Sequence, residues 1–365
     1  MRQPISSGSF AVIKVGSSSL TFIEGGLDPV AVKRTVNQVA DAWDAGYPSV
    51  LVTSAAVAAG IPVLGLASRP IDLPGLQVAA AVGQVALMSQ YAEAFARRGL
   101  VAGQVLLTKD VLANREQYVH SREALETMLR RGIVPVVNEN DTVVIEELKL
   151  GDNDRLAAIV AHLVDAEMLI MLTDTDGLYT GDPRTDDEAE LLQAVRHNEE
   201  VLDHISTEAN TKTSFGSGGV STKVVAARMA AWSGIPTVIA AATNEQAVVA
   251  ALRGQKVGTY VAPRQTRLAA RKLWIAFGVP TAGTVSVDDG AAEALVHHGR
   301  SLLSVGVVSI QGSFPAGAAV EVVDLTGGVL AKGIATMGSE ELIGPRPDGV
   351  SNLAIHRDDL VVFSE

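Results

Sequence analysis

The chain has 365 residues, a length typical of two or three domains. Hydrophobic residues make up 47% of it and cysteine is absent, so it can bury a large core, whereas disulfides, thiolate metal sites and thiol nucleophiles are excluded. A net charge of −12 argues against the broad basic surface that non-specific nucleic-acid binding requires. No apolar run approaches the roughly 18 residues of a membrane span and no signal-peptide pattern opens the chain, so we expect a cytoplasmic protein.

Strand-length apolar runs alternate with amphipathic helical patterns over the first two thirds of the chain. The runs predict strands at 10–15, 49–53, 104–108, 133–138, 168–173 and 236–240, and the patterns predict helices at 29–45, 77–98, 121–131, 154–163 and 222–233. Because the strands are apolar throughout, we expect an α/β fold whose sheet is covered on both faces. Ligands of such sheets bind beyond the carboxyl ends of the strands.

The stretch 182–208 differs from its surroundings, with nine Asp or Glu against two Arg and only short apolar runs. This composition predicts a mobile, solvated insertion that could act as a lid.

The pattern changes again after Ala262. Short β-like pieces punctuated by glycine follow, at 284–287, 306–310, 319–324 and 329–334. We therefore expect a first domain over 1–262, a linker over 263–279 and a small β-rich domain over 280–365. The last 103 residues contain 8 Lys or Arg against 11 Asp or Glu, so this domain is not strongly basic.

Two lysines lie beside turns of small residues. Lys14 precedes a Gly-Ser-Ser-Ser turn whose backbone N–H groups could hold phosphate oxygens, although neither a Walker A loop nor a dinucleotide fingerprint is present. A glycine-rich loop at 215–223 leads into a helix and places Lys223 in its first turns. An ordinary turn and a flexible linker, respectively, are the alternatives.

Four polar clusters follow predicted strands or open helices. They are Thr53-Ser54-Ala55-Ala56, Asn138-Glu139-Asn140-Asp141, Gly151-Asp152-Asn153-Asp154 and Thr173-Asp174-Thr175-Asp176-Gly177. Helix capping is the alternative for the first, through Ser54, and for the third, and an Asx turn is the alternative for the fourth.

Together, the lysines and the carboxylates at strand ends predict phosphoryl transfer. The transferred group needs its charge neutralised and its oxygens held in line, which lysines and Mg²⁺ can do without covalent chemistry. The seven histidines form no pair at metal-ligand spacing within these clusters, so a histidine base or a zinc site is poorly supported. A carboxylate acceptor is ionised at neutral pH and needs no base.

These motifs, in this order, resemble those of the amino acid kinase family, in the branch that phosphorylates the side-chain carboxylate of L-glutamate. The tail from about Pro280 resembles the PUA domain that many bacterial members carry. The resemblance covers nearly the whole chain and implies a three-layer α/β/α sandwich followed by a small PUA-like β-barrel. It also implies ATP with Mg²⁺, the first step of proline biosynthesis, inhibition by proline and a homo-oligomer, either dimer or tetramer.

The resemblance also assigns roles to residues. Lys14 and Lys223 would stabilise the phosphoryl charge and Asp154 would orient them. L-Glutamate would be held by Ser54, Ala55, Asn138, Asp141 and Asn153. ATP would be held by Lys14, Thr173, Asp174, Ser217, Gly218, Gly219, Val220, Ser221, Thr222 and Lys223, and Mg²⁺ by the ATP phosphates with no direct protein ligand.

The chain departs from the family pattern at three positions: Ala55 replaces a glycine, Leu150 a phenylalanine and Ser217 a threonine. If the first position needs a positive φ, alanine costs roughly 1 kcal/mol there, which bears on glutamate affinity more than on the kinase assignment. Relatives that phosphorylate N-acetylglutamate or aspartate are an alternative, but they usually lack this tail. RNA binding by the tail is a weaker alternative, because the tail is acidic and has few aromatic residues for base stacking.

Overall fold

The computed structural model describes residues 2–22, 24–143, 153–199, 201–202, 205, 219–343 and 352–363. The chain divides into two compact units, Met1–Arg267 and Leu268–Glu365.

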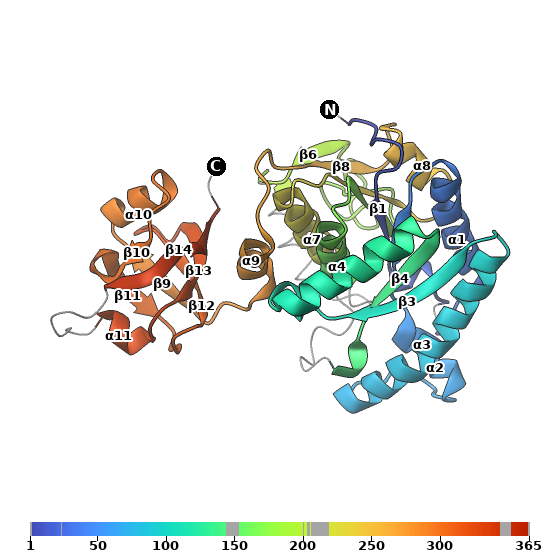
Figure 1. The fold of residues 1–365 in the computed structure, drawn as a ribbon, viewed down its shortest axis with the longest axis horizontal. Coiled ribbons are helices and arrows are strands. Elements are labelled where there is room, and N and C mark those ends of the chain that lie inside the picture. Colours follow the sequence, from blue (N-terminus) through green and yellow to red (C-terminus); the bar gives the residue numbers. More distant parts are fainter. Residues whose placement is uncertain are drawn as a thin grey trace. The chain divides into compact units, whose positions relative to one another are not determined.

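The first unit is built on an eight-stranded sheet (Figure 1). Its strands are β1 (Ala11–Val15), β2 (Ser49–Val52), β3 (Val101–Leu107), β4 (Ile133–Glu139), β5 (Met168–Thr173), β6 (Ala194–Arg196), β7 (Thr237–Ala241) and β8 (Thr259–Ala262). Their order is β3-β4-β2-β1-β5-β7-β8-β6, and every pair is parallel except β7 with β8. The carboxyl ends of β4, β2, β1 and β5 therefore meet at one edge.

Helices cover both faces of this sheet, as the apolar strands predict. The helices are α1 (Pro29–Asp44), α2 (Ala56–Val63), α3 (Leu73–Ala96), α4 (Arg115–Arg130), α5 (Asn153–Leu163), α7 (Val220–Trp232) and α8 (Ala247–Leu252), with short 3-10 turns at Ser17–Ser19, Lys109–Leu112 and Asp141–Val143. One core cluster joins α1, α2, α3 and α8 to the sheet, while α4, α5 and α7 contact the strands without joining that cluster. The result is the expected three-layer sandwich.

The alternation of side chains along β1 determines where its lysine points. Ala11, Ile13 and Val15 belong to the core shared with α1 and α3. Successive side chains of a strand point to opposite faces, so Val12 and Lys14 face the layer that contains α5 and α7. Both of those helices begin with residues of the predicted site.

Helices α2 and α3 cross at two glycines. A Cβ on Gly60 would lie 2.0 Å from the carbonyl oxygen of Ala79, and a Cβ on Gly83 would lie 1.8 Å from the carbonyl oxygen of Ala56. Any larger side chain at either position would push the helices apart. This crossing fixes the start of α2 against the middle of α3.

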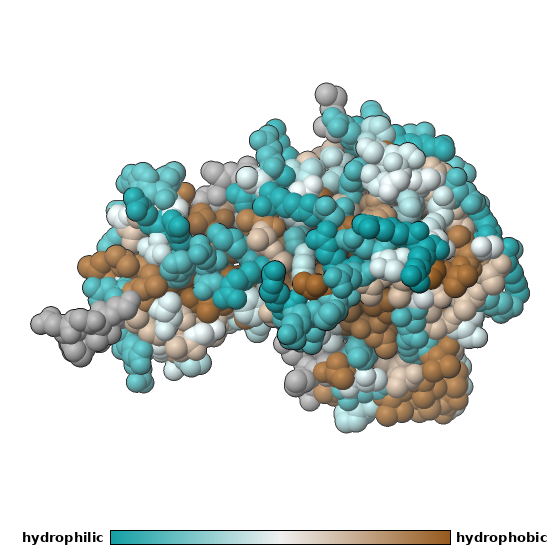
Figure 2. All heavy atoms as spheres, viewed as in Figure 1, coloured by the Kyte–Doolittle hydropathy of each residue, from teal (hydrophilic) through white to brown (hydrophobic). Residues whose placement is uncertain are grey.

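Exposed apolar side chains gather over α2, α3 and the segment between them (Figure 2). Val63 is 60% exposed, Ile71 is 99% exposed and Val85 is 73% exposed. Clustered apolar exposure of this kind is typical of an interaction surface.

Several elements start earlier than the periodicity predicts, or were not predicted. α3 begins at Leu73 and α4 at Arg115, because the side chains of Asp72 and Asn114 accept hydrogen bonds from first-turn N–H groups. α2, α8, β6 and β8 were missed. The stretch expected to be a solvated insertion contributes β6, whose Val195 is buried and which pairs with β8.

The second unit is a curled six-stranded sheet with its own core. Its order is β10-β14-β13-β12-β9-β11, made of β9 (Gly283–Val287), β10 (Leu302–Leu303), β11 (Val307–Gln311), β12 (Ala319–Val323), β13 (Val329–Ala335) and β14 (Leu353–Val362). Two helices, α10 (Asp289–Val296) and α11 (Ser339–Ile343), and a 3-10 turn at Ser304–Gly306 lie between strands. Before β9, in the stretch expected as a linker, come α9 (Ala270–Leu273) and a π-helix (Trp274–Gly278), and Lys332 of β13 donates to the carbonyl of Val279 at 2.5 Å. We did not predict β14.

Candidate active site

Two lysines and one aspartate, far apart in the sequence, meet in the interior of the first unit. The Nζ atom of Lys14 lies 2.6 Å from Oδ1 of Asp154, and the Nζ atom of Lys223 lies 3.5 Å from Oδ2. All three residues are buried: Lys14 is 3% exposed, Asp154 1% and Lys223 8%. They come from the end of β1, the first turn of α5 and the first turn of α7. The structure thus brings together the three residues that we expected to be catalytic.

The charge balance of this centre stabilises the ionised carboxylate. Burial by itself would raise the pKa of Asp154. The ammonium groups of Lys14 and Lys223 lower it by more, so the net pKa lies well below its usual range and the carboxyl stays ionised. The hydroxyl of Thr222 also donates to Oδ2 at 2.6 Å. Asp154 therefore fixes both lysines and a residue of the glycine-rich loop.

The N-terminus of α7 lies beside this centre without a side-chain cap. Gly219 occupies the cap position and, having no side chain, makes no capping hydrogen bond to the first turn. Free N–H groups and the helix dipole attract phosphate. Ser217 and Gly218, also expected to bind ATP, lie outside the described residues.

The end of β5 carries the other residues expected to bind ATP. Thr173 is buried, its hydroxyl donates to Oδ1 of Asp174 at 3.0 Å, and Asp174 is exposed. β5 pairs directly with β1. These two side chains therefore lie at the same sheet edge as Lys14, one strand away.

The side chains of Asn138 and Asn153 converge on one backbone group. The N–H of Glu139 donates to Oδ1 of Asn138 at 2.9 Å and to Oδ1 of Asn153 at 3.1 Å. This shared donor joins the end of β4 to the start of α5. Both residues were expected to hold glutamate, and both are buried.

Sequence reasoning missed Gln84, which lies in the middle of α3. Its Oε1 atom accepts from Nδ2 of Asn138 at 2.8 Å, and the residue is 9% exposed. One glutamine within a long apolar helix has no motif around it. Only its burial at the α2–α3 crossing, where Gly83 is its neighbour, distinguishes it.

Asp141 is also buried, in the short 3-10 turn after β4. Burial raises the pKa of its carboxyl to about 6, and the positive charge of Arg69 offsets only part of that effect. Its Oδ1 atom has no hydrogen-bond partner among the described residues. A buried carboxylate in this state favours a cationic ligand.

The turn between β2 and α2 has a positive φ at Ala55, the position where the family pattern has a glycine. Ala55 has φ 80° and ψ 8°, in the left-handed region. It also occupies the N-cap position of α2, and no side chain caps that helix, so the capping interpretation of Ser54 is wrong. Ser54 is buried, and the neighbouring Thr53 hydroxyl lies 2.8 Å from the hydroxyl of Tyr91 on α3.

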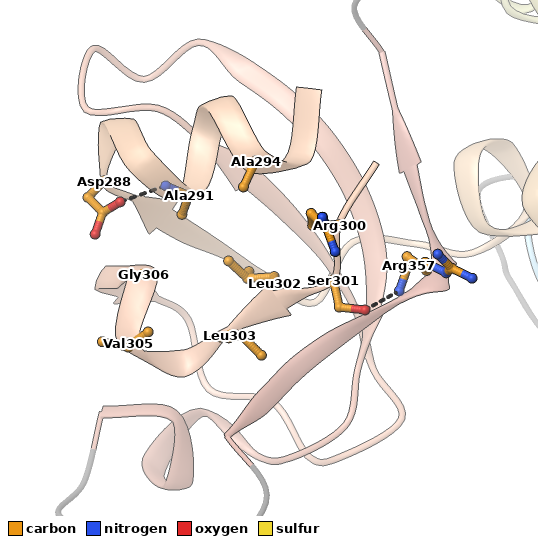
Figure 3. A pocket seen from close by; sticks show the side chains of 10 residues that line it. All are labelled: Asp288, Ala291, Ala294, Arg300, Ser301, Leu302, Leu303, Val305, Gly306 and Arg357. Atoms are coloured by element: carbon orange, nitrogen blue, oxygen red, sulfur yellow. Dashed lines mark hydrogen bonds between the residues drawn. The ribbon is translucent and has the colours of Figure 1, made fainter. Parts of the chain in front are cut away.

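A cavity of about 570 Å³ lies in the second unit (Figure 3). Its wall includes Ala291, Leu302 and Val305 with two arginines, Arg300 and Arg357. The Arg357 side chain is 66% exposed. None of the residues expected to bind substrate lines this cavity.

In the part of the chain that the structure describes, no three His, Asp or Glu side chains lie together as a metal site requires. No described helix combines the length and the hydropathy of a membrane span.

Comparisons with known proteins identify the family of the chain. Residues 9–241 match the amino acid kinase family and residues 283–345 match the PUA domain. The chain is 43% identical to glutamate 5-kinase of Geobacter sp. (strain M21) over 96% of this chain and 97% of that protein. It is 42% identical to glutamate 5-kinase of Moorella thermoacetica, over 99% and 98% of the two chains, and 41% identical to that of Marinomonas sp. (strain MWYL1), over the full length of both.

Among solved structures, UMP kinase from Bacillus anthracis aligns with a TM-score of 0.49 and 12% identity, over 72% of this chain and 98% of that chain. The family match covers well over half of the chain, and three relatives exceed 40% identity over nearly its whole length. The chain therefore belongs to the amino acid kinase family and carries a C-terminal PUA domain.

Proposed function

We propose that this protein is a glutamate 5-kinase. It would transfer the γ-phosphoryl group of ATP to the side-chain carboxylate of L-glutamate, giving L-glutamyl 5-phosphate and ADP. The observation that carries the proposal is the buried Lys14–Asp154–Lys223 centre. The relatives named glutamate 5-kinase, which match along the whole chain, support the choice of acceptor.

In the proposed reaction, an oxygen of the acceptor carboxylate attacks the γ-phosphorus while the bond from that phosphorus to the ADP oxygen breaks. The attacking oxygen is already anionic at neutral pH, so no general base is needed. Negative charge spreads over the phosphoryl oxygens as the bond breaks. Lys14 and Lys223 stabilise that charge, and Asp154 keeps both ammonium groups in place before ATP arrives.

Mg²⁺ fits this arrangement as an ion carried by the nucleotide. Asp154 already contacts Lys14, Lys223 and Thr222, so its oxygens are engaged before any metal arrives. When bound, the ion would neutralise part of the phosphate charge. We propose that the ATP phosphates are its main ligands.

The nucleotide would lie over the end of β5 and the start of α7. We propose that Thr173 and Asp174 contact it on one side and that the loop Ser217–Lys223 contacts its phosphates on the other. Glutamate would lie over the ends of β2 and β4, held by Ser54, Ala55, Asn138, Asp141 and Asn153. The two ligands would then meet above β1, where Lys14 ends the strand.

The direct test is ADP release by the purified protein with Mg·ATP and one acceptor at a time. L-Glutamate should give turnover, whereas aspartate, N-acetylglutamate and the absence of an acceptor should give less than about one hundredth of it. Preferred use of N-acetylglutamate or aspartate would contradict the proposal. Hydroxylamine trapping of the acyl phosphate would confirm that the acceptor atom is a carboxylate oxygen.

We further propose inhibition by proline, a homo-oligomeric state of two or four subunits and a cytoplasmic location, as the first enzyme of proline biosynthesis would have. The exposed apolar side chains of α2 and α3 support the oligomer. Light scattering of the wild type and of Val85→Asp tests the oligomer, because a charge at a buried subunit contact should dissociate the assembly.

Inhibition by proline is tested by the KM for glutamate. Proline should raise this KM if proline and glutamate compete for one site, and an unchanged KM would contradict the proposal.

A further inference from the structure

The hydrogen bonds around Asn138 fix the orientation of the Gln84 amide. A backbone N–H can only donate, so the atom of Asn138 that contacts the Glu139 N–H must be its oxygen. The other terminal atom of Asn138 is then the NH₂ group, which donates to Gln84. Gln84 consequently presents Oε1 to Asn138, and its own NH₂ group points elsewhere.

This NH₂ group is buried without a partner. Nε2 of Gln84 has no hydrogen-bond acceptor among the described residues, although the side chain is only 9% exposed. A buried donor without an acceptor is costly, and such groups in folded proteins are usually satisfied by a ligand or by water. Within the described residues, Gln84 thus places an unsatisfied N–H donor next to Asn138.

Asp141, which follows β4 in the chain three residues after Asn138, is an acceptor and not a donor. Its Oδ1 atom lacks a donor. It belongs to the turn that follows β4, and that turn contacts α3, where Gln77 donates to the carbonyl of Thr142 at 3.4 Å. A ligand that satisfies both groups must offer an acceptor to Gln84 and a donor or cation to Asp141. An α-amino acid has a carboxylate and an ammonium group on one carbon.

The sheet register shows which end of glutamate these groups can reach. Lys14 lies beside Val52 of β2, and Val52 lies beside Val137 of β4, so Asn138 and Lys14 end their strands at the same edge. They are two strands apart, or about 10 Å. Three carbon atoms separate the two carboxyl groups of glutamate. If the reacting carboxylate lies near Lys14, the α-carboxylate extends towards β4 and α3.

From this placement we propose that the Gln84 amide donates a hydrogen bond to the α-carboxylate of the acceptor, and so selects substrates in which that carboxylate is free. The proposal rests on the proposed function for the identity of the acceptor. Gln84 would bind substrate and take no part in phosphoryl transfer. Its loss should therefore raise the KM for the acceptor and leave the chemical step and ATP binding nearly unchanged.

The variant Gln84→Glu separates this role from a structural one. A glutamate at this position keeps an oxygen that can accept from Asn138, but it replaces the NH₂ donor with a second acceptor. If Gln84 only supports Asn138, this change leaves the acceptor KM unaltered. If Gln84 binds the α-carboxylate, the KM for L-glutamate rises at least about tenfold, the loss expected for a hydrogen bond to a charged group.

The experiment compares two acceptors, L-glutamate and L-isoglutamine, in which the α-carboxylate is an amide and the reacting carboxylate is unchanged. Gln84→Glu should lower the ratio of kcat/KM for glutamate to kcat/KM for isoglutamine at least about tenfold. The new carboxylate repels the α-carboxylate of glutamate, whereas it can accept a hydrogen bond from the α-amide of isoglutamine. The KM for Mg·ATP should change less than about twofold. Gln90→Glu, the same substitution at a half-buried position of α3 outside the proposed site, should leave the ratio unchanged.

An unchanged ratio in Gln84→Glu overturns the proposal. Should that variant fail to fold, as judged by its melting curve, the same ratio measured in Gln84→Met decides the question. If the wild type releases no ADP with glutamate, the proposed function has failed separately. Calorimetric titration of L-glutamate then decides on Gln84: weaker binding to Gln84→Glu than to the wild type supports the inference, and equal binding or no binding to the wild type overturns it.

Discussion

The two halves of the candidate site differ in how their buried polar groups are satisfied. In the Lys14–Asp154–Lys223 centre the buried charges contact one another. On the acceptor side, Nε2 of Gln84 and Oδ1 of Asp141 have no partner among the described residues. In the proposed reaction, the first half is therefore arranged for phosphoryl transfer before any ligand binds. The second half would be completed by the acceptor, so substitutions there should act on KM, and without the acceptor its buried groups should lower the stability of the protein.

The largest effect should come from the paired centre. Lys223→Ala should lower kcat at least about a thousandfold, because the charge of the transferred group loses a buried ammonium. Nucleotide binding should partly survive, which equilibrium dialysis with ATP can measure. Lys33→Ala, the same change at an exposed position of α1, is the control. Near-normal turnover of Lys223→Ala would remove Lys223 from the chemical step.

A large effect on the acceptor side should come from its scaffold. Gly83→Ala would place a methyl group 1.8 Å from the carbonyl oxygen of Ala56, so α2 and α3 must separate. We expect the free energy of unfolding to fall by about 3 kcal/mol, measured by urea denaturation. In Gly290→Ala, on α10, the added methyl group would lie 3.4 Å from Oδ1 of Asp288, an ordinary contact. This variant should change the free energy of unfolding by less than about 1 kcal/mol. Equal effects of the two substitutions would show that the crossing is not tight.

The buried Asp141 makes the cost of the incomplete half measurable. Because burial raises its pKa from 3.8 to about 6, the folded state binds the proton more tightly than the unfolded state. The folded protein is therefore most stable, as far as Asp141 is concerned, below about pH 4, where the carboxyl is protonated in both states. This stability is lost as the pH rises through 6 and the buried carboxyl must ionise. At pH 7.5, Asp141→Asn should stabilise the ligand-free protein by up to about 3 kcal/mol, with a smaller gain at pH 4.5.

The same variant should bind glutamate more weakly, so stability and substrate binding move in opposite directions. Asp187→Asn at an exposed position is the control and should change neither. A loss of stability in Asp141→Asn at pH 7.5 would show that the carboxylate is satisfied without ligand, which would contradict the comparison of the two halves.

The smallest effect should come from the turn at Ala55. Since its φ is 80°, Ala55→Gly should raise the free energy of unfolding by about 1 kcal/mol. Ala58→Gly, the same substitution within α2, should lower it by about 1 kcal/mol because glycine weakens a helix interior. Thermal unfolding of both variants tests the opposite signs. A shift in the KM for glutamate in Ala55→Gly would show that this strain also affects acceptor binding.

Much of the fold could be predicted from local pattern. The buried strands β1, β4, β5 and β7 were predicted to within one or two residues, because continuous apolar runs ending in small polar residues identify such strands. The start of α3 was misplaced, since its first turn is stabilised by the cap at Asp72 and not by apolar periodicity. β6 and β8 were missed because they are only three and four residues long, too short for a clear apolar pattern.

The sequence by itself predicted the kind of chemistry, because lysines beside glycine or serine turns and carboxylates at strand ends are local signals, and its resemblance to the amino acid kinase family pointed to Lys14, Asp154 and Lys223 as the paired centre. The tertiary structure decided how they combine: Asp154 contacts lysines 140 and 69 positions away in the chain. It alone identified Gln84, whose role depends on the α2–α3 crossing and on a hydrogen bond to a strand 54 positions away. Burial and convergence are properties of packed elements, and no local pattern in the sequence records them.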